Sequence, residues 1–315
     1  MKPLISVVIA TYNASHLLRH AIASVRLQDR SDWEIIVVSD HSPDDTESVV
    51  TSFGDDRIRF IDLPRNSGQQ ATPNNVGVKA ARGDYLAFLN QDDLYLPDHL
   101  SSSLAFLNET GADLVCCPCA QIMPEQAERI AAREIVARAD CFELTGRFSP
   151  YTFHVASSWF LRRATALAVG PWRLERETWV TPSQDWLFRA WRAGARIRCS
   201  KRISVVLLYS GLRRDSYRNR DSREHDFVFA ETIASDRLRP ALRAAAERWI
   251  ADAAGPEFRR RRRRLRSFRK LVLHLLRSAI HALLSSFGVH PLSLTMRRRF
   301  GARGGFIAEL KKFTG

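Results

Sequence analysis

Four short apolar segments alternate with helical or polar segments in the first 90 residues, and this alternation most restricts how the chain can fold. The segments are residues 4–10, 33–40, 58–63 and 84–90, and several are continuously apolar and rich in Val and Ile. Strands that are buried on both faces are typical of parallel sheets with helices on either side. The sequence therefore predicts an α/β fold with a mostly parallel central sheet flanked by helices.

Polar side chains gather where these predicted strands end. They are Thr11, Tyr12 and Asn13 after the first strand, Asp40 after the second, Asn66 after the third, and Asp92 with Asp93 after the fourth. Ligands of such sheets bind at the carboxyl ends of the strands. Asp is also common at a helix N-terminus, which is the alternative reading of the paired carboxylates. The coincidence of four polar clusters favours a binding site.

The chain beyond residue 100 is less regular, but its elements can be placed. We expect a strand at 113–119, a surface helix at 125–139, a strand leading into a short helix within 152–170, a helix at 182–194, a strand at 202–210, a polar loop at 213–225 and a helix at 227–250. Asp185 falls in the first turn of the helix at 182–194, where the helix dipole favours a carboxylate.

The two common glycine-rich phosphate motifs are absent from the sequence. No G-x-G-x-x-G follows the first strand, and there is no G-x-x-x-x-G-K-[ST] loop. A bound diphosphate would then need a divalent cation to neutralise it. Mg²⁺ and Mn²⁺ prefer carboxylate oxygens and keep substrate phosphates as ligands. One or two Asp at a strand end meet that requirement.

Five segments, in this order, give the sequence a wider resemblance. They are "PLISVVIATYN", "EIIVVSDHSPDDT", "RNSGQQATPNNVG", "GDYLAFLNQDD" and "SQDW". The order and spacing resemble the inverting glycosyltransferases of family 2, over roughly residues 3–215. The resemblance implies the GT-A fold and a nucleotide-sugar donor, with UDP as the expected nucleotide.

The resemblance also implies roles for single residues. Thr11, Tyr12 and Asn13 would line the nucleoside pocket, Asp40 would bind the edge of the base, Asn66 and Gly68 would lie near the nucleotide, and Arg65 would contact phosphate or ribose. The D-x-D motif of the family falls on Asn90, Gln91 and Asp92. Asp92, followed by Asp93, would hold Mn²⁺ or Mg²⁺ against the donor diphosphate. Asp185, preceded by Gln184, would be the general base.

The sequence departs from the family pattern at three points. Asn90 stands in place of the first Asp of D-x-D, and Gln184 in place of a Glu, so we expect a lower affinity for the metal. No His directly follows the strand at 202–210, and the first one is His225. The arginines at 213, 214 and 218 could contact the diphosphate or form a solvated loop. The Q-x-x-R-W motif of processive synthases is absent, which predicts one sugar added per encounter.

The net charge of +14 belongs to the C-terminal part of the chain. Residues 251–315 contain 16 basic and 3 acidic residues, whereas the rest of the chain is nearly balanced. Residues 258–270 are mostly Arg. Residues 271–287 have apolar residues at helical spacing, but this segment is too short and too polar to cross a bilayer, which takes about 20 apolar residues. A basic amphipathic helix predicts binding to an anionic membrane through residues 258–306. A solvated tail is the alternative, and the balanced remainder of the chain argues against nucleic acid.

The five cysteines are expected to be small buried hydrophobic residues. Cys116, Cys117 and Cys119 form "CCPC", but no second ligand group at zinc spacing accompanies them. Trp186 and Trp191 are expected to pack in the core, although stacking on a sugar is the alternative.

The prediction is therefore a metal-dependent, non-processive, inverting glycosyltransferase, peripheral to the cytoplasmic face of the membrane, with a glycan or lipid-linked acceptor. We divide it into a nucleotide-sugar-binding half (1–100), an acceptor-binding half with the base (101–225), a helical connector (226–255) and a basic amphipathic tail (256–315). The alternatives are a GDP- or dTDP-sugar donor, a catalytically weakened nucleotide-sugar-binding or scaffold protein, and a basic nucleic-acid-binding protein.

Overall fold

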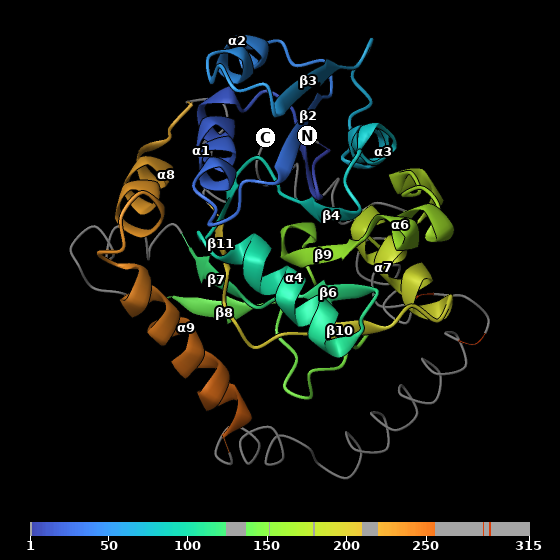
Figure 1. Ribbon diagram of the computed structural model, residues 1–315, viewed down its shortest axis with the longest axis vertical. Helices are drawn as coiled ribbons and strands as arrows, with labels where there is room; N and C mark the ends of the chain where they lie inside the picture. The colour runs from blue at the N-terminus through green and yellow to red at the C-terminus, as the bar shows by residue number, and fades with distance from the viewer. Residues whose placement is uncertain are drawn as a thin grey trace.

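The computed structural model describes residues 2–123, 137–150, 152–178, 180–209 and 220–255, together with Ser286 and His290 (Figure 1). Its central feature is a seven-stranded sheet with the strand order β10-β6-β9-β4-β1-β2-β3. The strands are β1 (Ile5–Thr11), β2 (Trp33–Ser39), β3 (Ile58–Asp62), β4 (Tyr85–Phe88), β6 (Leu114–Cys116), β9 (Trp159–Arg162) and β10 (Ile197–Cys199). All neighbours run parallel except β9, which is antiparallel to β4 and β6. The predicted mostly parallel sheet is confirmed.

Helices cover both faces of this sheet (Figure 1). One face packs against α1 (Ser15–Arg26), α2 (Thr46–Thr51) and α4 (His99–Thr110), and the other against α3 (Ala71–Ala80), α6 (Arg163–Val169) and α7 (Pro182–Arg192). Successive side chains of a strand point to opposite faces. Accordingly, Val7 and Ile9 of β1 lie in the first core, while Val8 lies in the second. This double burial is why the strands are apolar throughout.

A second sheet of four strands has the order β5-β11-β7-β8. Its strands are β5 (Asp93–Tyr95), β11 (Val205–Leu208), β7 (Cys119–Ile122) and β8 (Arg138–Asp140). It packs against α8 (Arg223–Val228), the π-helical turn Phe229–Ile233 and α9 (Arg239–Ala254). Only the four residues 89–92 separate the end of β4 from the start of β5, so the two sheets meet next to the predicted site.

Four predicted elements differ in the structure. The strand expected at 113–119 is two strands in different sheets, and Pro118, which lacks an N–H for a ladder, lies between them. The helix expected at 125–139 is wrong at its end, because Arg138–Asp140 is β8; residues 124–136 lie outside the described part.

The prediction of a loop at 213–225 is wrong from Arg223 onward, where α8 begins. Residues 210–219 lie outside the residues that the structure describes. The helix expected at 227–250 is interrupted before Arg239, where α9 starts with a Pro in its first turn, a position that suits proline.

All five cysteines are buried and free, as expected. Trp186 is buried in the core, whereas Trp191 is 38% exposed and stacks on Phe188. The predicted amphipathic tail lies outside the described residues except at two points. The His290 ring lies 4.8 Å from that of Phe188, and Arg192 donates to the Ser286 carbonyl. None of the helices in the described ranges is long and apolar enough to cross a membrane.

The predicted halves 1–100 and 101–225 both contribute strands to the seven-stranded sheet. The division of the chain into four parts stays a prediction.

Candidate functional site

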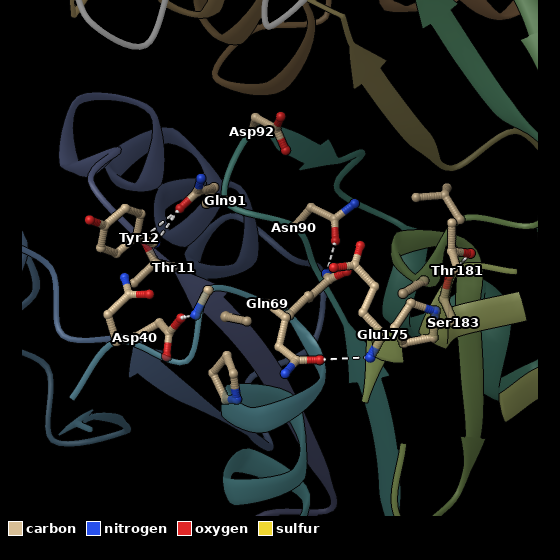
Figure 2. A pocket seen from close by; sticks show the side chains of 18 of the residues that line it. Thr11, Tyr12, Asp40, Gln69, Asn90, Gln91, Asp92, Glu175, Thr181 and Ser183 are labelled. Atoms are coloured by element: carbon tan, nitrogen blue, oxygen red, sulfur yellow. Dashed lines mark hydrogen bonds between the residues drawn. The ribbon is translucent and has the colours of Figure 1, made fainter. Parts of the chain in front are cut away.

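A cavity of about 690 Å³ opens at the carboxyl ends of β1, β2 and β4 (Figure 2). Its lining combines strand ends with the loop before α3 and the start of α7. The lining residues are Ala10, Thr11, Tyr12, Asp40, Asn66, Gly68, Gln69, Gln70, Pro73, Asn90, Gln91, Asp92, Phe153, Val155, Ala156, Glu175, Thr181, Pro182 and Ser183. A cavity therefore lies at the edge of the sheet where the sequence predicted a site.

The end of β1 is tied to the loop after β4 by Gln91. The Gln91 side-chain oxygen accepts hydrogen bonds from the Thr11 hydroxyl (2.7 Å) and from the Tyr12 N–H (2.9 Å). Thr11 is buried, whereas the Tyr12 side chain is 45% exposed. Gln91 thus fixes two walls of the cavity relative to each other.

Asp40 holds the loop that precedes α3. Its carboxylate accepts the N–H groups of Ser67 (2.9 Å) and Gly68 (3.0 Å). Gly68 has φ +69°, a backbone conformation that glycine adopts without steric cost. This loop presents Asn66 to the cavity, but Arg65 is exposed and is not among the lining residues.

Asn13 also lies outside the cavity lining. Its N–H donates to the Ser42 hydroxyl (3.2 Å), and its φ is 48°. The structure therefore brings seven of the predicted site residues to one cavity, namely Thr11, Tyr12, Asp40, Asn66, Gly68, Gln91 and Asp92, together with Asn90 of the altered D-x-D motif. Arg65 and Asn13 are not among its lining residues.

Asn90 is held by three hydrogen bonds. Its side-chain oxygen accepts from the Gln70 amide (2.6 Å), and its side-chain nitrogen donates to the Asp93 carboxylate (2.9 Å). Its backbone N–H donates to the Ser157 hydroxyl (3.0 Å). An amide at position 90 therefore satisfies an acceptor on one side and a donor on the other, which a carboxylate cannot do.

The two adjacent carboxylates have different surroundings. Asp92 lines the cavity, while Asp93 is the first residue of β5, is 5% exposed and accepts the Ser157 hydroxyl (2.5 Å). Burial, with the neighbouring Asp92 charge, raises the pKa of Asp93 well above its ordinary value. The metal role predicted for Asp93 stays untested, and its side chain lies in the protein interior rather than in the cavity lining.

His225 supports Asp92 from α8, 133 residues away in the sequence. Its Nε2 lies 2.9 Å from the Asp92 carbonyl oxygen, and the ring is buried. Burial lowers the pKa of His225, so the neutral ring donates its Nε2 proton to that carbonyl. The carboxylate of the next residue, Asp226, lies 2.8 Å from Arg19 Nη2 and 2.8 Å from His20 Nε2, both on α1. These contacts fix α8 against α1. Only the fold reveals this contact, because no local motif surrounds His225.

Asp185 lies in the first turn of α7, but it does not line the cavity. The helix begins after Thr181, whose hydroxyl accepts the Gln184 N–H (3.4 Å). The Asp185 carboxylate is bound by Arg189 Nε (2.9 Å) and lies 3.7 Å from Arg173 Nη1. The residues just before it, Thr181 to Ser183, are those that reach the cavity. The predicted role of Asp185 as base stays a prediction that this placement does not favour.

Glu175 is a lining residue that the sequence did not point to. It begins the 3₁₀ turn Glu175–Glu177, and its N–H donates to the Gln69 side-chain oxygen (2.9 Å). Its side chain extends into the cavity toward Asn90 (Figure 2). No motif marks this position, and only its tertiary placement brings it to the site.

The described lining of the cavity is acidic. Three carboxylates line it, those of Asp40, Asp92 and Glu175, and no Lys or Arg does so among the residues that the structure describes. Within the same residues, no three His, Cys, Asp or Glu side chains are grouped closely enough to hold a metal by themselves. Mg²⁺ and Mn²⁺ are commonly bound by one or two carboxylates, with water and substrate phosphates completing the shell. Asp92 fits a metal that is bound together with a diphosphate.

Comparison with known proteins adds a family to this geometry. The family model for glycosyl transferase family 2 matches residues 6–169, which is more than half of the chain. Among curated relatives, the GalNAc(5)-diNAcBac-PP-undecaprenol beta-1,3-glucosyltransferase of Campylobacter jejuni is 41% identical over 110 residues, 34% of this chain and 35% of that protein. The putative teichuronic acid biosynthesis glycosyltransferase TuaG of Bacillus subtilis is 37% identical over 110 residues, 34% of this chain and 43% of its own length. The matched part is thus less than half the length of these relatives.

Solved structures share the fold. TarS of S. aureus (residues 1–349, in complex with UDP-GlcNAc) has a TM-score of 0.54 at 20% identity, covering 66% of this chain and 58% of that one. The mannosyltransferase PcManGT from Pyrobaculum calidifontis, in complex with GDP-Man and Mn²⁺, has a TM-score of 0.53 at 16% identity and covers 96% of this chain and 88% of that one. This likeness confirms the predicted GT-A fold.

Proposed function

The chain belongs to glycosyl transferase family 2, and from this premise we propose that it transfers a sugar from a nucleotide-sugar to a glycan or lipid-linked acceptor, with inversion and with a divalent cation. One observation carries the proposal: a single cavity joins the ends of β1, β2 and β4 to Asp92, and its described lining is acidic. A diphosphate enters such a cavity favourably only when a cation accompanies it.

The donor would lie against the walls built by β1, β2 and the loop before α3. Tyr12 offers an exposed ring for the nucleoside, and Asn66 and Gly68 offer polar atoms at the cavity surface. Asp40 would serve mainly by holding that loop, because two backbone N–H groups already occupy its carboxylate. UDP is the expected nucleotide, and the predicted contacts of Arg65 and Asn13 stay predictions.

Asp92 would hold the cation. A bound Mn²⁺ or Mg²⁺ supplies charge that stabilises the departing diphosphate. His225 fixes the Asp92 backbone, and Asn90 with the buried Asp93 fixes the turn that precedes β5. We therefore assign Asp93 to positioning Asp92 rather than to binding the metal.

The acceptor would be lipid-linked, because the Campylobacter jejuni relative carries undecaprenol in the name of its substrate. Residues 258–306 would bring the enzyme to the anionic cytoplasmic membrane face, where such lipids are presented. Deleting residues 256–315 should then abolish co-sedimentation with vesicles containing phosphatidylglycerol and leave nucleotide binding unchanged. Unchanged sedimentation would remove the membrane role from this segment.

A catalytically weakened nucleotide-sugar-binding protein is the second candidate. The observation behind it is that Asp185, the predicted base, is paired with arginines outside the cavity. That candidate predicts nucleotide binding without turnover.

Calorimetric titration of UDP, GDP and dTDP, each with and without Mn²⁺, tests the proposal. We expect one nucleotide to bind only with Mn²⁺, and Asp92→Asn to lose that binding. Asp84→Asn is a matched control, because Asp84 is an exposed carboxylate that pairs with Lys2. Binding of no nucleotide under any condition refutes the proposed function, and equal losses in both variants refute the role of Asp92.

A further inference from the structure

We propose that the β10 edge of the seven-stranded sheet, together with the end of α7, is a surface that binds the headgroups of anionic phospholipids. The proposed function assigns membrane binding to residues 258–306 alone, and this inference adds a surface of the folded part of the chain. We call this surface the basic edge, and its residues are Arg147, Trp191, Arg192, Arg196, Arg198 and Lys201.

The charge of the folded part is divided unevenly along the chain. Residues 1–123 contain 9 basic and 16 acidic residues, whereas residues 137–209 contain 12 basic and 5 acidic residues. The acidic segment includes β3 and the basic segment includes β10, and these two strands are the opposite edges of the seven-stranded sheet (Figure 1). Six spacings of about 4.8 Å place the two edges about 29 Å apart, so the opposite charges are separated across the molecule.

The exposed charges of residues 137–209 are almost all positive. Among the residues of this range that the structure describes, eight basic residues are exposed, and Glu177 is the one exposed acid. Arg147 and Lys201 pair with no carboxylate of the described residues. Arg196 pairs with Asp113 (3.2 Å), but 61% of its side chain stays exposed. Positive charge that the fold does not neutralise attracts an anionic partner.

The local structure gathers these basic residues around one short strand. β10 pairs with β6 on one side, and on its other side Arg198 forms an isolated antiparallel bridge with Arg147. Arg192 is the last residue of α7, Arg196 directly precedes β10, and Lys201 is the second residue after it. The five basic residues therefore surround an edge strand, and none of them lines the cavity of the candidate site.

The C-terminal part of the chain meets the folded part beside the basic edge. Arg192 donates to the Ser286 carbonyl (3.0 Å), and the His290 ring lies 4.8 Å from that of Phe188. Trp191 stacks on the same Phe188 and is 38% exposed. Tryptophan is enriched where proteins meet lipid headgroups. These contacts join the basic edge to the segment that we predict to bind the membrane, so the two can face one bilayer.

An anionic bilayer matches this surface because the positive charges are spread along an edge and do not converge on a pocket. Each Lys or Arg close to an anionic membrane strengthens binding about fivefold. Residues 251–315, with 16 basic residues, supply most of the attraction, so their deletion removes co-sedimentation. The basic edge decides which side of the folded part faces the lipid.

This orientation has a consequence for the acceptor, which rests on the proposed function. α7 begins at the cavity, where Pro182 and Ser183 are lining residues, and it ends at the basic edge. Its 11 residues span about 16 Å at a rise of about 1.5 Å per residue. A membrane against the basic edge therefore lies close enough for the head of a lipid-linked acceptor to enter the cavity while its lipid stays in the bilayer.

Co-sedimentation of the full chain with vesicles of phosphatidylcholine and phosphatidylglycerol, at several salt concentrations, tests the inference. We expect Arg147→Gln combined with Lys201→Gln to lower the binding constant about 25-fold and to weaken its dependence on salt. The melting temperature and UDP binding should stay unchanged. The matched control is Lys2→Gln combined with Lys79→Gln, which removes the same charge from two exposed residues of the acidic segment and should bind like the wild type.

Quenching of tryptophan fluorescence by brominated lipids tests the orientation. Residues 251–315 contain no tryptophan, so the quenching reports on the folded part of the chain. We expect Trp191→Phe to lose most of the quenching, because its ring lies at the basic edge. Trp249→Phe is the control, since it removes a ring of α9 that is 44% exposed, and it should keep the quenching.

Equal losses of vesicle binding in the two double variants overturn the inference, as does quenching that disappears with Trp249 instead of Trp191. A wild type that binds no anionic vesicle, or binds phosphatidylcholine alone equally well, also overturns it. RNA binding that is lost in the Arg147 and Lys201 variant while vesicle binding persists would assign the basic edge to nucleic acid instead. Vesicle binding requires no sugar transfer, so these outcomes are distinct from a failure of the proposed function, which nucleotide titration reveals.

Discussion

Replacing Asn90 by Asp would restore the acidic pair of the D-x-D motif, yet we expect it to weaken the protein. The Asn90 side-chain nitrogen lies 2.9 Å from the Asp93 carboxylate, to which it donates a hydrogen bond. In the Asn90→Asp variant, a second carboxylate oxygen takes the place of that donor. Two full charges at this separation would repel by about 6 kcal/mol at an effective dielectric constant of about 20, so one carboxyl will stay protonated.

The net cost can be bounded from these contacts. A protonated carboxyl can still donate a hydrogen bond to its neighbour, so the cost is that of keeping this proton near neutral pH, about 1.4 kcal/mol for each pH unit above the unfolded pKa of about 4. We expect a loss of about 3 kcal/mol, or about 6–12 °C in melting temperature for a domain of this size. Because the folded variant keeps a proton that the unfolded chain releases, the loss should grow as the pH rises above about 4.

Circular dichroism melting at several pH values measures this effect, with Mn²⁺-dependent UDP titration alongside it. Asn108→Asp is the control, because Asn108 is exposed in the last turn of α4 and Asp keeps the side-chain oxygen that accepts the Tyr85 hydroxyl (3.5 Å). We expect this control to lose less than about 1 kcal/mol of unfolding free energy, because a negative charge in the last turn of a helix is unfavourable to the helix dipole. A variant that melts like the wild type and binds Mn²⁺ and UDP more tightly would refute the reasoning.

Three further predictions follow from single contacts. Burial raises the pKa of Asp93 in the folded protein. The free energy of unfolding of the wild type should therefore fall as the pH rises from the pKa of Asp in the unfolded chain, about 4, toward the higher pKa of folded Asp93, and Asp93→Asn should flatten this dependence in urea titrations. His225→Phe removes the donor to the Asp92 carbonyl and should weaken Mn²⁺-dependent UDP binding about 5–10-fold in calorimetry, while His225→Gln retains most of it. Gly77→Ala should cost about 1–3 kcal/mol in denaturant unfolding, because its methyl group would overlap Val8, and Val8→Ala should recover part of the loss.

The first half of the fold could be predicted because its strands are buried on both faces. Such strands are apolar throughout, and the polar ends of β1, β2 and β4 therefore stand out in the sequence. The second half could not be predicted as well, since β6, β7 and β8 have only three or four residues each. Strands this short take their conformation from the neighbours with which they pair, and not from their own pattern.

The candidate site divides along the same line. Asp40 follows the seven-residue β2, and Asp92 follows the apolar run that contains β4, so both could be found from the sequence. The sequence could not show whether the Asp93 side chain enters the cavity together with that of Asp92. Adjacent residues in an extended chain point to opposite sides, and only the pairing of β5 with β11 shows which side is interior. Glu175 and His225 reach the site through tertiary placement alone, from a 3₁₀ turn and from a six-residue helix.

The two neutral replacements in the family motifs have one physical explanation. Asn90 donates its amide proton to the buried Asp93 carboxylate, and Gln184 donates its own to the His154 carbonyl (2.8 Å) in a buried setting. A carboxylate in either place would leave a buried acceptor without its donor and add a charge to the interior, which is costly. These amides therefore serve the packing behind the cavity, and they do not by themselves argue for a weakened enzyme. The cavity keeps Asp92 in its lining for the cation that the proposed reaction needs.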